Sequence, residues 1–115
     1  MVTNVTSLTG NGLKDWLIQR ITALYFAIYI VILGGFLFNH PALAYHEWQA
    51  LFAHLGFKIA TMLALIAFVL HAWIGIWTVT TDYVKCVCVR LTAQVVVAFI
   101  LISQVIWGSM IVWGQ

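Results

Sequence analysis

One histidine, His71, lies inside an uncharged and strongly apolar stretch of the sequence, residues 59–81. In a helix it stands ~18 Å along the axis from Ile59, near the middle of a membrane-spanning segment. An ionisable residue at that depth is costly and by default marks a functional site. The roles open to a neutral buried imidazole are metal or haem ligation and proton relay. The plain alternative is a histidine hydrogen-bonded between two helices.

The other histidines, His40, His46 and His54, lie outside the predicted hydrocarbon core. Even the nearest, His54, would be at least ~25 Å from His71 along a continuous helix, so none of them can share a metal ion with it. If His71 is an axial haem ligand, the second ligand comes from another subunit or the iron is five-coordinate. Gly75, one helical turn on, either leaves room for a macrocycle or is an ordinary packing glycine.

Asp82 and Tyr83 form a second pair with chemical potential. Eleven residues separate Asp82 from His71, and a rotation of about 1100° places both on nearly one helix face, ~16 Å apart. A phenol beside a carboxylate at a membrane boundary can donate a hydrogen bond to a ligand carbonyl and help to move protons. A helix-end carboxylate next to an interface tyrosine is the plainer explanation, and spacing alone favours it.

The composition places these residues in a membrane. Of the 115 residues, 64% are hydrophobic and 7% are charged, whereas a soluble domain is about 25% charged. This composition excludes a soluble globule, a disordered tail and a secreted disulfide scaffold. A formal net charge of +2 over the whole chain makes no basic patch, so it also excludes a nucleic-acid binder.

Three long gaps in the charge pattern predict three spanning helices. No Asp, Glu, Lys or Arg occurs in 21–46, 59–81 or 91–115, and a spanning helix needs roughly 20 apolar residues. We therefore predict an all-α membrane protein with a single membrane-anchor domain, residues 1–115. The approximate spans are 21–38, 59–81 and 91–113.

A short interfacial helix is predicted between the first two spans. Asn39-His40-Pro41 ends the first span, because a residue before proline is pushed out of the helical region. Between Ala42 and Phe57, aromatic and apolar residues recur at helical spacing with polar residues between them. This pattern is typical of a helix that lies at the membrane surface.

The positions of lysine and arginine predict the orientation. Lys14, Arg20, Lys85 and Arg90 fall on one side and Lys58 alone on the other, which places the N-terminus in the cytoplasm and the C-terminus outside. The polar first residues do not form a cleavable signal peptide, and no organelle presequence precedes the first span. We therefore expect a multi-pass protein of the bacterial inner membrane with a periplasmic C-terminus.

Cys86 and Cys88 fall in the predicted cytoplasmic loop, where we expect reduced thiols. Their C-x-C spacing without a following histidine is not a covalent haem motif, and a zinc site would need two more ligands. The simplest interpretation is that they are small apolar residues.

The three predicted spans expose much more lateral surface than they bury between themselves. Gly34-Gly35, Gly75 and Gly108 do not form a GxxxG pair, which would let two helices approach closely. This pattern indicates that another chain completes the bundle.

The residues around His71 resemble a known family. The run His71-Ala-Trp-Ile-Gly-Ile-Trp77, followed by Thr81-Asp82-Tyr83-Val84-Lys85, resembles the smaller hydrophobic membrane-anchor (cytochrome b) subunit of bacterial succinate dehydrogenase, or complex II. The length and the three-span layout are similar to the same family. So are Asn11-Gly12, Arg20, Thr22-Ala23 and the C-terminal Val112-Trp113-Gly114.

The resemblance implies roles for four residues. His71 would be one of two axial ligands of a b-type haem iron, with the other ligand from the larger anchor subunit. Tyr83 would hydrogen-bond a ubiquinone carbonyl, and Asp82 would lie beside it. Arg20 would reach a haem propionate, although a topology-setting positive charge also explains it.

The same resemblance implies an anchor subunit of succinate:ubiquinone oxidoreductase, which acts in the respiratory chain and the tricarboxylic acid cycle. This chain alone would hold no complete active site. Its implied partners are a larger cytochrome b anchor subunit, an iron–sulfur subunit and a flavoprotein subunit. Haem b is the implied cofactor, and ubiquinone is the implied substrate.

Two residues depart from the family pattern, and other interpretations remain open. Thr78 stands where the closest relatives would have an amide, and Cys86 where they would have a proline. A fumarate reductase anchor and a non-redox structural anchor are the main alternatives. A small multidrug exporter would be expected to have four spans and a carboxylate within the membrane.

Overall fold

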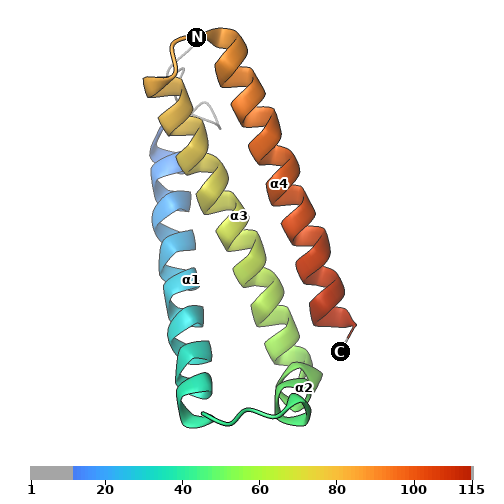
Figure 1. Cartoon of the computed structure of the whole chain (residues 1–115). Coiled ribbons are helices and arrows are strands. Elements are labelled where there is room, and N and C mark those ends of the chain that lie inside the picture. Colours follow the sequence, from blue (N-terminus) through green and yellow to red (C-terminus); the bar gives the residue numbers. More distant parts are fainter. Residues whose placement is uncertain (1–11, 115) are drawn as a thin grey trace.

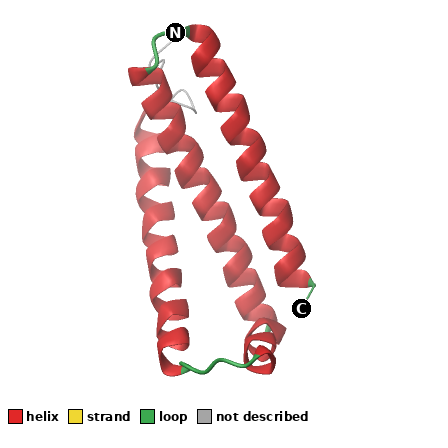
Figure 2. Ribbon diagram, viewed as in Figure 1, coloured by secondary structure: helices red, strands yellow, loops and turns green. Residues whose placement is uncertain are grey.

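The computed structural model describes residues 12–114, and its regular elements are all helices (Figures 1 and 2). Three of the helices are long and apolar enough to cross a membrane. The predicted fold class, three such helices with a short one between the first and the second, is confirmed. The elements are α1 (Gly12–Asn39), α2 (Tyr45–Ala53), α3 (Leu55–Tyr83) and α4 (Val87–Trp113).

Helix α3 is the centre of the bundle. Helices α1 and α4 pack along it, and α2 packs against it where it begins (Figure 1). The start of α1 and the short connection between α3 and α4 lie at one end of the bundle, which we call the loop end. Helix α2 lies at the opposite end, the α2 end. The bundle is 53 Å long, so it can cross a hydrocarbon layer of ~30 Å with its helix ends outside that layer.

The long helices extend beyond the predicted spans. Helix α1 begins at Gly12 rather than near residue 21, and α3 begins at Leu55 rather than at 59. The apolar stretch marks the part of a helix that can lie in hydrocarbon, whereas helical hydrogen bonding continues into the interface. Asp15 in the first turn of α1 favours this extension, because a negative charge is stabilised at a helix N-terminus.

The first long helix ends where the sequence predicts. Helix α1 stops at Asn39, two residues before Pro41. The ring of His40 stacks on Phe36 with 4.3 Å between centroids, and its Nδ1 lies 2.8 Å from the main-chain oxygen of Phe36. The side chain of His40 thus donates a hydrogen bond to a carbonyl in the last turn, where no N–H of the helix is left to do so.

Helix α2 is shorter than the predicted 42–57 segment and is held by aromatic contacts. Phe52 is buried, and its ring lies 4.8 Å from that of Trp48 and 4.9 Å from that of Phe57. Phe57 in turn stacks on Tyr29 of α1 at 5.8 Å. These contacts fix the connection between α1 and α3 at the α2 end.

The apolar core of the described residues is thin. Most large hydrophobic side chains on the three long helices are exposed in the single chain. Exposed apolar faces of this extent require lipid or another protein chain around them. The buried apolar residues are Phe52, Ala64, Ala67, Ile74, Leu101 and Val112.

Polar contacts link α3 to both neighbours. The hydroxyl of Tyr25 donates to the main-chain oxygen of Ala60 at 2.8 Å, and the hydroxyl oxygen of Tyr29 lies 2.7 Å from Thr61 Oγ1. Towards α4, buried Gln94 donates from Nε2 to Thr80 Oγ1 at 2.8 Å. Such hydrogen bonds hold helices together where hydrocarbon gives apolar faces no reason to associate.

Thr80→Val should destabilise the protein more than Gln94→Leu. Valine leaves the Gln94 amide buried without this acceptor, at a cost of about 1–3 kcal/mol. Leucine leaves Thr80 still donating to the main-chain oxygen of Ile76 at 2.7 Å. The measurement is loss of helical circular dichroism of the purified protein as sodium dodecyl sulfate is added.

Thr92→Val is the matched control for this experiment. Thr92 donates only to the main-chain oxygen of Cys88 in its own helix and is exposed. The Thr80→Val/Gln94→Leu double variant should recover part of the lost stability. Equal costs for the two single variants would contradict the importance of the buried pair.

Candidate functional site

His71 is half-buried on α3 and faces α1. Its Nδ1 lies 3.2 Å from the main-chain oxygen of Gln19 and 3.4 Å from Thr22 Oγ1. Thr22 is buried, and its hydroxyl lies 2.6 Å from the main-chain oxygen of Ile18, one turn back. The interhelical hydrogen bond given above as the plain alternative is therefore present, and it uses only one of the two ring nitrogens.

The surroundings of Nδ1 determine the tautomer of His71. The Gln19 carbonyl can only accept a hydrogen bond, and the short contact to Ile18 takes the hydroxyl proton of Thr22. Both neighbours of Nδ1 therefore act as acceptors, so we assign the ring proton to Nδ1 and the lone pair to Nε2. Histidines that ligate metals through one nitrogen usually donate the other N–H to such a carbonyl.

A groove of about 270 Å³ opens beside His71. Its walls come from Ala23, Phe26 and Ala27 of α1 and from Phe68 and His71 of α3. The two alanines keep the α1 wall low, and the two phenylalanine rings, 5.6 Å apart, make it apolar. The groove can accept a flat apolar group next to an imidazole.

Arg20 lies on the same face of α1 as the two groove alanines. It precedes Ala23 and Ala27 by three and seven residues, which are neighbouring positions on one helix face. Arg20 is exposed, and its guanidinium carbon lies 5.2 Å from the ring centroid of Trp16. Arg20 therefore offers a positive charge on the loop-end side of the groove.

Asp82 and Tyr83 are the last two residues of α3, at the loop end. Both are exposed, and Tyr83 is 77% exposed. Tyr83 lies twelve residues beyond His71, which is ~18 Å along the helix axis. The structure therefore does not bring this pair into contact with His71. Exposed Thr78, one of the two positions expected to depart from the family pattern, donates to the main-chain oxygen of Ile74 at 2.9 Å.

Three residues of α1 that the sequence analysis did not connect to His71 lie on one face of the helix. Asp15, Gln19 and Thr22 follow one another at helical spacing, and Asp15 is 8% exposed. At the loop end, Asp15 is therefore buried, whereas Asp82 is exposed. The spacing of these polar residues in an otherwise apolar helix was the signal that could have predicted a shared face.

Two buried polar atoms on α1 and α3 have no hydrogen-bond partner within the described part of the chain. They are Gln19 Oε1 and Trp77 Nε1. Buried polar groups are nearly always paired, so these two atoms stand out among the described residues. Trp77 lies six residues beyond His71 on α3, towards the loop end. The Gln19 side chain lies beside Gly75, also on the loop-end side of His71.

Gly75 lies against α1 rather than in the groove. A Cβ atom at this position would be 3.5 Å from Gln19 Nε2, an ordinary contact distance. Of the two interpretations given above, the structure favours the packing glycine. Among residues 12–114, no three His, Cys, Asp or Glu side chains come together as a metal site. A metal ion held by His71 therefore needs ligands from outside these residues.

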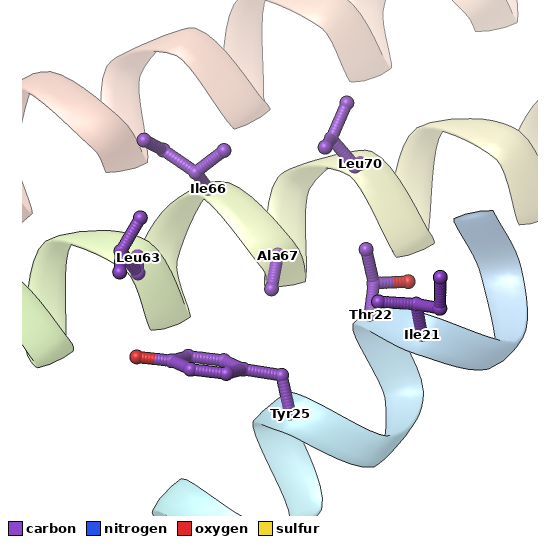
Figure 3. A pocket seen from close by; sticks show the side chains of 7 residues that line it. All are labelled: Ile21, Thr22, Tyr25, Leu63, Ile66, Ala67 and Leu70. Atoms are coloured by element: carbon purple, nitrogen blue, oxygen red, sulfur yellow. The ribbon is translucent and has the colours of Figure 1, made fainter.

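A second groove, of about 200 Å³, lies on the other side of Thr22 and carries no chemistry of its own (Figure 3). On α1, Ile21, Thr22 and Tyr25 line this groove, whereas Ala23 and Ala27 line the one beside His71. Its remaining walls are apolar side chains of α3. They are Leu63, Ile66, Ala67 and Leu70.

The fold and the site together define a small polytopic helical membrane protein with one histidine at membrane depth, held by a neighbouring helix. The profile of the family described as Succinate dehydrogenase/Fumarate reductase transmembrane subunit matches residues 6–107. The chain is also 42% identical over 109 residues to the succinate dehydrogenase hydrophobic membrane anchor subunit of Coxiella burnetii, covering 95% of each chain.

The chain therefore belongs to the succinate dehydrogenase/fumarate reductase transmembrane subunit family, and the resemblance inferred from the sequence is confirmed. Asn11, which contributed to that resemblance, lies outside the described residues. The matched region includes His71, Asp82, Tyr83 and Arg20.

The exposed thiols in the loop should differ in reactivity. The backbone N–H groups of Val89 and Cys88 lower the pKa of the Cys86 thiol, although its sulfur makes no capping hydrogen bond of ordinary geometry. Because its pKa is lowered, Cys86 remains a reactive thiolate at pH values at which an ordinary thiol is already protonated. It becomes protonated only when the pH falls through the lowered pKa. Iodoacetamide should therefore alkylate Cys86 at lower pH than Cys88.

Single-cysteine variants measure the two thiols separately. Cys88→Ala reports Cys86 and keeps the two N–H groups, whereas Cys86→Ala reports Cys88. Mass spectrometry of the alkylated protein gives the rate at each pH. Coincident pH profiles would contradict the lowered pKa of Cys86.

Proposed function

We propose that this chain is the hydrophobic membrane-anchor subunit of a succinate:ubiquinone oxidoreductase. In this role it co-ligates haem b through His71 and forms part of the site where ubiquinone is reduced. The family and the Coxiella burnetii anchor subunit support the class of complex. The observation that carries the haem assignment is the environment of His71, with Nδ1 on the α1 carbonyl and a groove alongside.

The residues beside His71 fit a haem group. Nε2 carries the lone pair that an iron ligand needs, and the alanine-walled groove can take one edge of a flat macrocycle. The groove is much smaller than a haem, so most of the macrocycle would be covered by the larger anchor subunit, which would also bring the second axial ligand. Arg20, on the same face of α1, would hold a propionate. When bound, the haem supplies a one-electron redox centre.

The quinone site is proposed at the loop end. The exposed phenol of Tyr83 can donate a hydrogen bond to a quinone carbonyl, which fixes the head group and polarises the bond that receives electrons. Asp82 beside it is exposed and can relay protons from water. Reduction of the quinone to quinol consumes two electrons and two protons, so a site at the membrane boundary suits the reaction.

The orientation and the partners follow from the same proposal. The loop end carries Lys14, Arg20, Lys85 and Arg90, whereas Lys58 stands near the α2 end over the ring of Trp113. The positive-inside rule then puts the loop end in the cytoplasm of a bacterium. The flavoprotein that oxidises succinate and the iron–sulfur subunit that carries its electrons would dock at that end, close to Tyr83.

A fumarate reductase anchor is the second candidate, because the family description includes both enzymes. The two complexes use the same chemistry in opposite directions. Identification of the quinone that co-purifies with the complex, by mass spectrometry, distinguishes them. Ubiquinone is the expected result, and a low-potential naphthoquinone alone would favour fumarate reductase.

His71→Ala should abolish the normal b-type haem spectrum of the purified complex. Alanine removes the only ligand that this proposal assigns to the chain, so the haem should be lost or left with one fewer axial ligand. The measurement is the dithionite-reduced minus oxidised absorption spectrum. His54→Ala, at an exposed position on the α2 side, is the control and should leave that spectrum unchanged. An unaltered spectrum in His71→Ala would refute the ligation.

Tyr83→Phe should impair quinone reduction while leaving the haem bound. Phenylalanine keeps the ring but removes the donor to the quinone carbonyl, a loss of about 10²-fold or more in turnover by analogy with other electrostatic donors. Succinate-driven ubiquinone reduction is compared with succinate oxidation by an artificial dye acceptor, which should persist. Tyr45→Phe, exposed at the opposite end, is the control. Full quinone reductase activity in Tyr83→Phe would remove Tyr83 from the site.

A further inference from the structure

The two α1 groups that contact His71 have a role beyond packing. We propose that Thr22 Oγ1 and the main-chain carbonyl of Gln19 are positioning groups that fix the His71 tautomer and increase electron donation from Nε2, so that they lower the reduction potential of the bound haem. The inference rests on the proposed function, because it concerns the haem that His71 would ligate. It assigns to α1 a part of the control over that haem.

Thr22 can act as an acceptor because its proton is already used. Its Oγ1 lies 2.6 Å from the main-chain oxygen of Ile18 and 3.3 Å from that of Gln19. The shorter contact takes the hydroxyl proton, and a lone pair then faces His71 Nδ1 at 3.4 Å. Thr22 is 7% exposed, so water has little access to compete for this contact.

The Gln19 carbonyl is the shorter of the two contacts to Nδ1, at 3.2 Å. A second contact of Gln19 helps to fix where this carbonyl lies along α3. The Gln19 side chain lies against Gly75, one turn beyond His71. The Gln19 backbone and side chain therefore contact α3 at consecutive turns. This arrangement fixes the height of the carbonyl relative to the imidazole.

Two acceptors on Nδ1–H affect the iron through the imidazole ring. As the N–H proton is drawn towards an acceptor, the ring gains negative character and Nε2 becomes a stronger donor. A stronger donor favours the ferric over the ferrous iron, which lowers the reduction potential. At a buried site of low dielectric the effect is greater than in water.

The test uses Thr22→Val in the purified complex. Valine has nearly the shape of threonine, so the packing between α1 and α3 is kept while one acceptor is removed. The haem should stay bound through His71, and its midpoint potential in an equilibrium redox titration should rise relative to the wild type. The electron paramagnetic resonance g values of the ferric haem should shift as well. An unchanged potential with haem bound would overturn the proposal.

Further variants distinguish the acceptor from the packing. Thr22→Ser keeps the hydroxyl and should retain the wild-type potential, so a rise as large as that of the valine variant would overturn the role of the hydroxyl. Thr22→Ala removes the same acceptor in a smaller, helix-favouring residue and serves if the valine variant does not assemble. Thr92→Val is the matched control, because Thr92 makes the same bond to its own helix but is exposed on α4.

The outcome for Thr22 is separable from the outcome for His71. If His71→Ala removes the haem spectrum and Thr22→Val leaves the potential unchanged, the ligation stands and the positioning role fails. If His71→Ala leaves the spectrum intact, the haem is held elsewhere and both proposals fail.

Discussion

The rest of this structure depends on the hydrogen bond between His71 on α3 and the main chain of α1. Within a hydrocarbon layer an imidazole N–H must find its partner in the protein, because no water is there to replace it. The Gln19 carbonyl, 3.2 Å away, supplies this partner. The bond fixes the two helices beside the groove and leaves Nε2 available for a ligand. One side chain thus stabilises the helix pair and prepares the site.

The same principle explains how a chain with so thin a core keeps three helices in register. Helix α3 is joined to α1 by the hydroxyls of Tyr25 and Tyr29 and to α4 by the buried pair Thr80 and Gln94. Lipid surrounds apolar side chains as well as a protein does, so hydrogen bonds and close packing specify which faces meet. The apolar faces left over are then free to meet other subunits of the complex without disturbing these links.

The sequence was sufficient to predict the three long helices and the short one, because charge is excluded from hydrocarbon and Pro41 ends a helix. It also indicated His71, since an ionisable residue in such a stretch stands out. It did not predict the burial of Asp15 or the contacts of Gln19 and Thr22. These depend on how α1 is rotated against α3, and the only signal for that rotation was the spacing of three polar residues in a helix whose other faces are mostly apolar. The role of Gly75 was left open for the same reason.

The two sides of α1 around Thr22 differ in the residues that line them. Ile21, Thr22 and Tyr25 line a mostly apolar groove (Figure 3), whereas Ala23 and Ala27 line the groove that contains His71. Arg20 shares the second face by helical spacing, so a positive charge lies on the same side of α1 as the groove that contains His71. If His71 ligates a haem as proposed, a subunit that supplies the second iron ligand would approach on the side of this groove. The other groove is lined by no histidine and no charged residue, so it is suited to lipid chains.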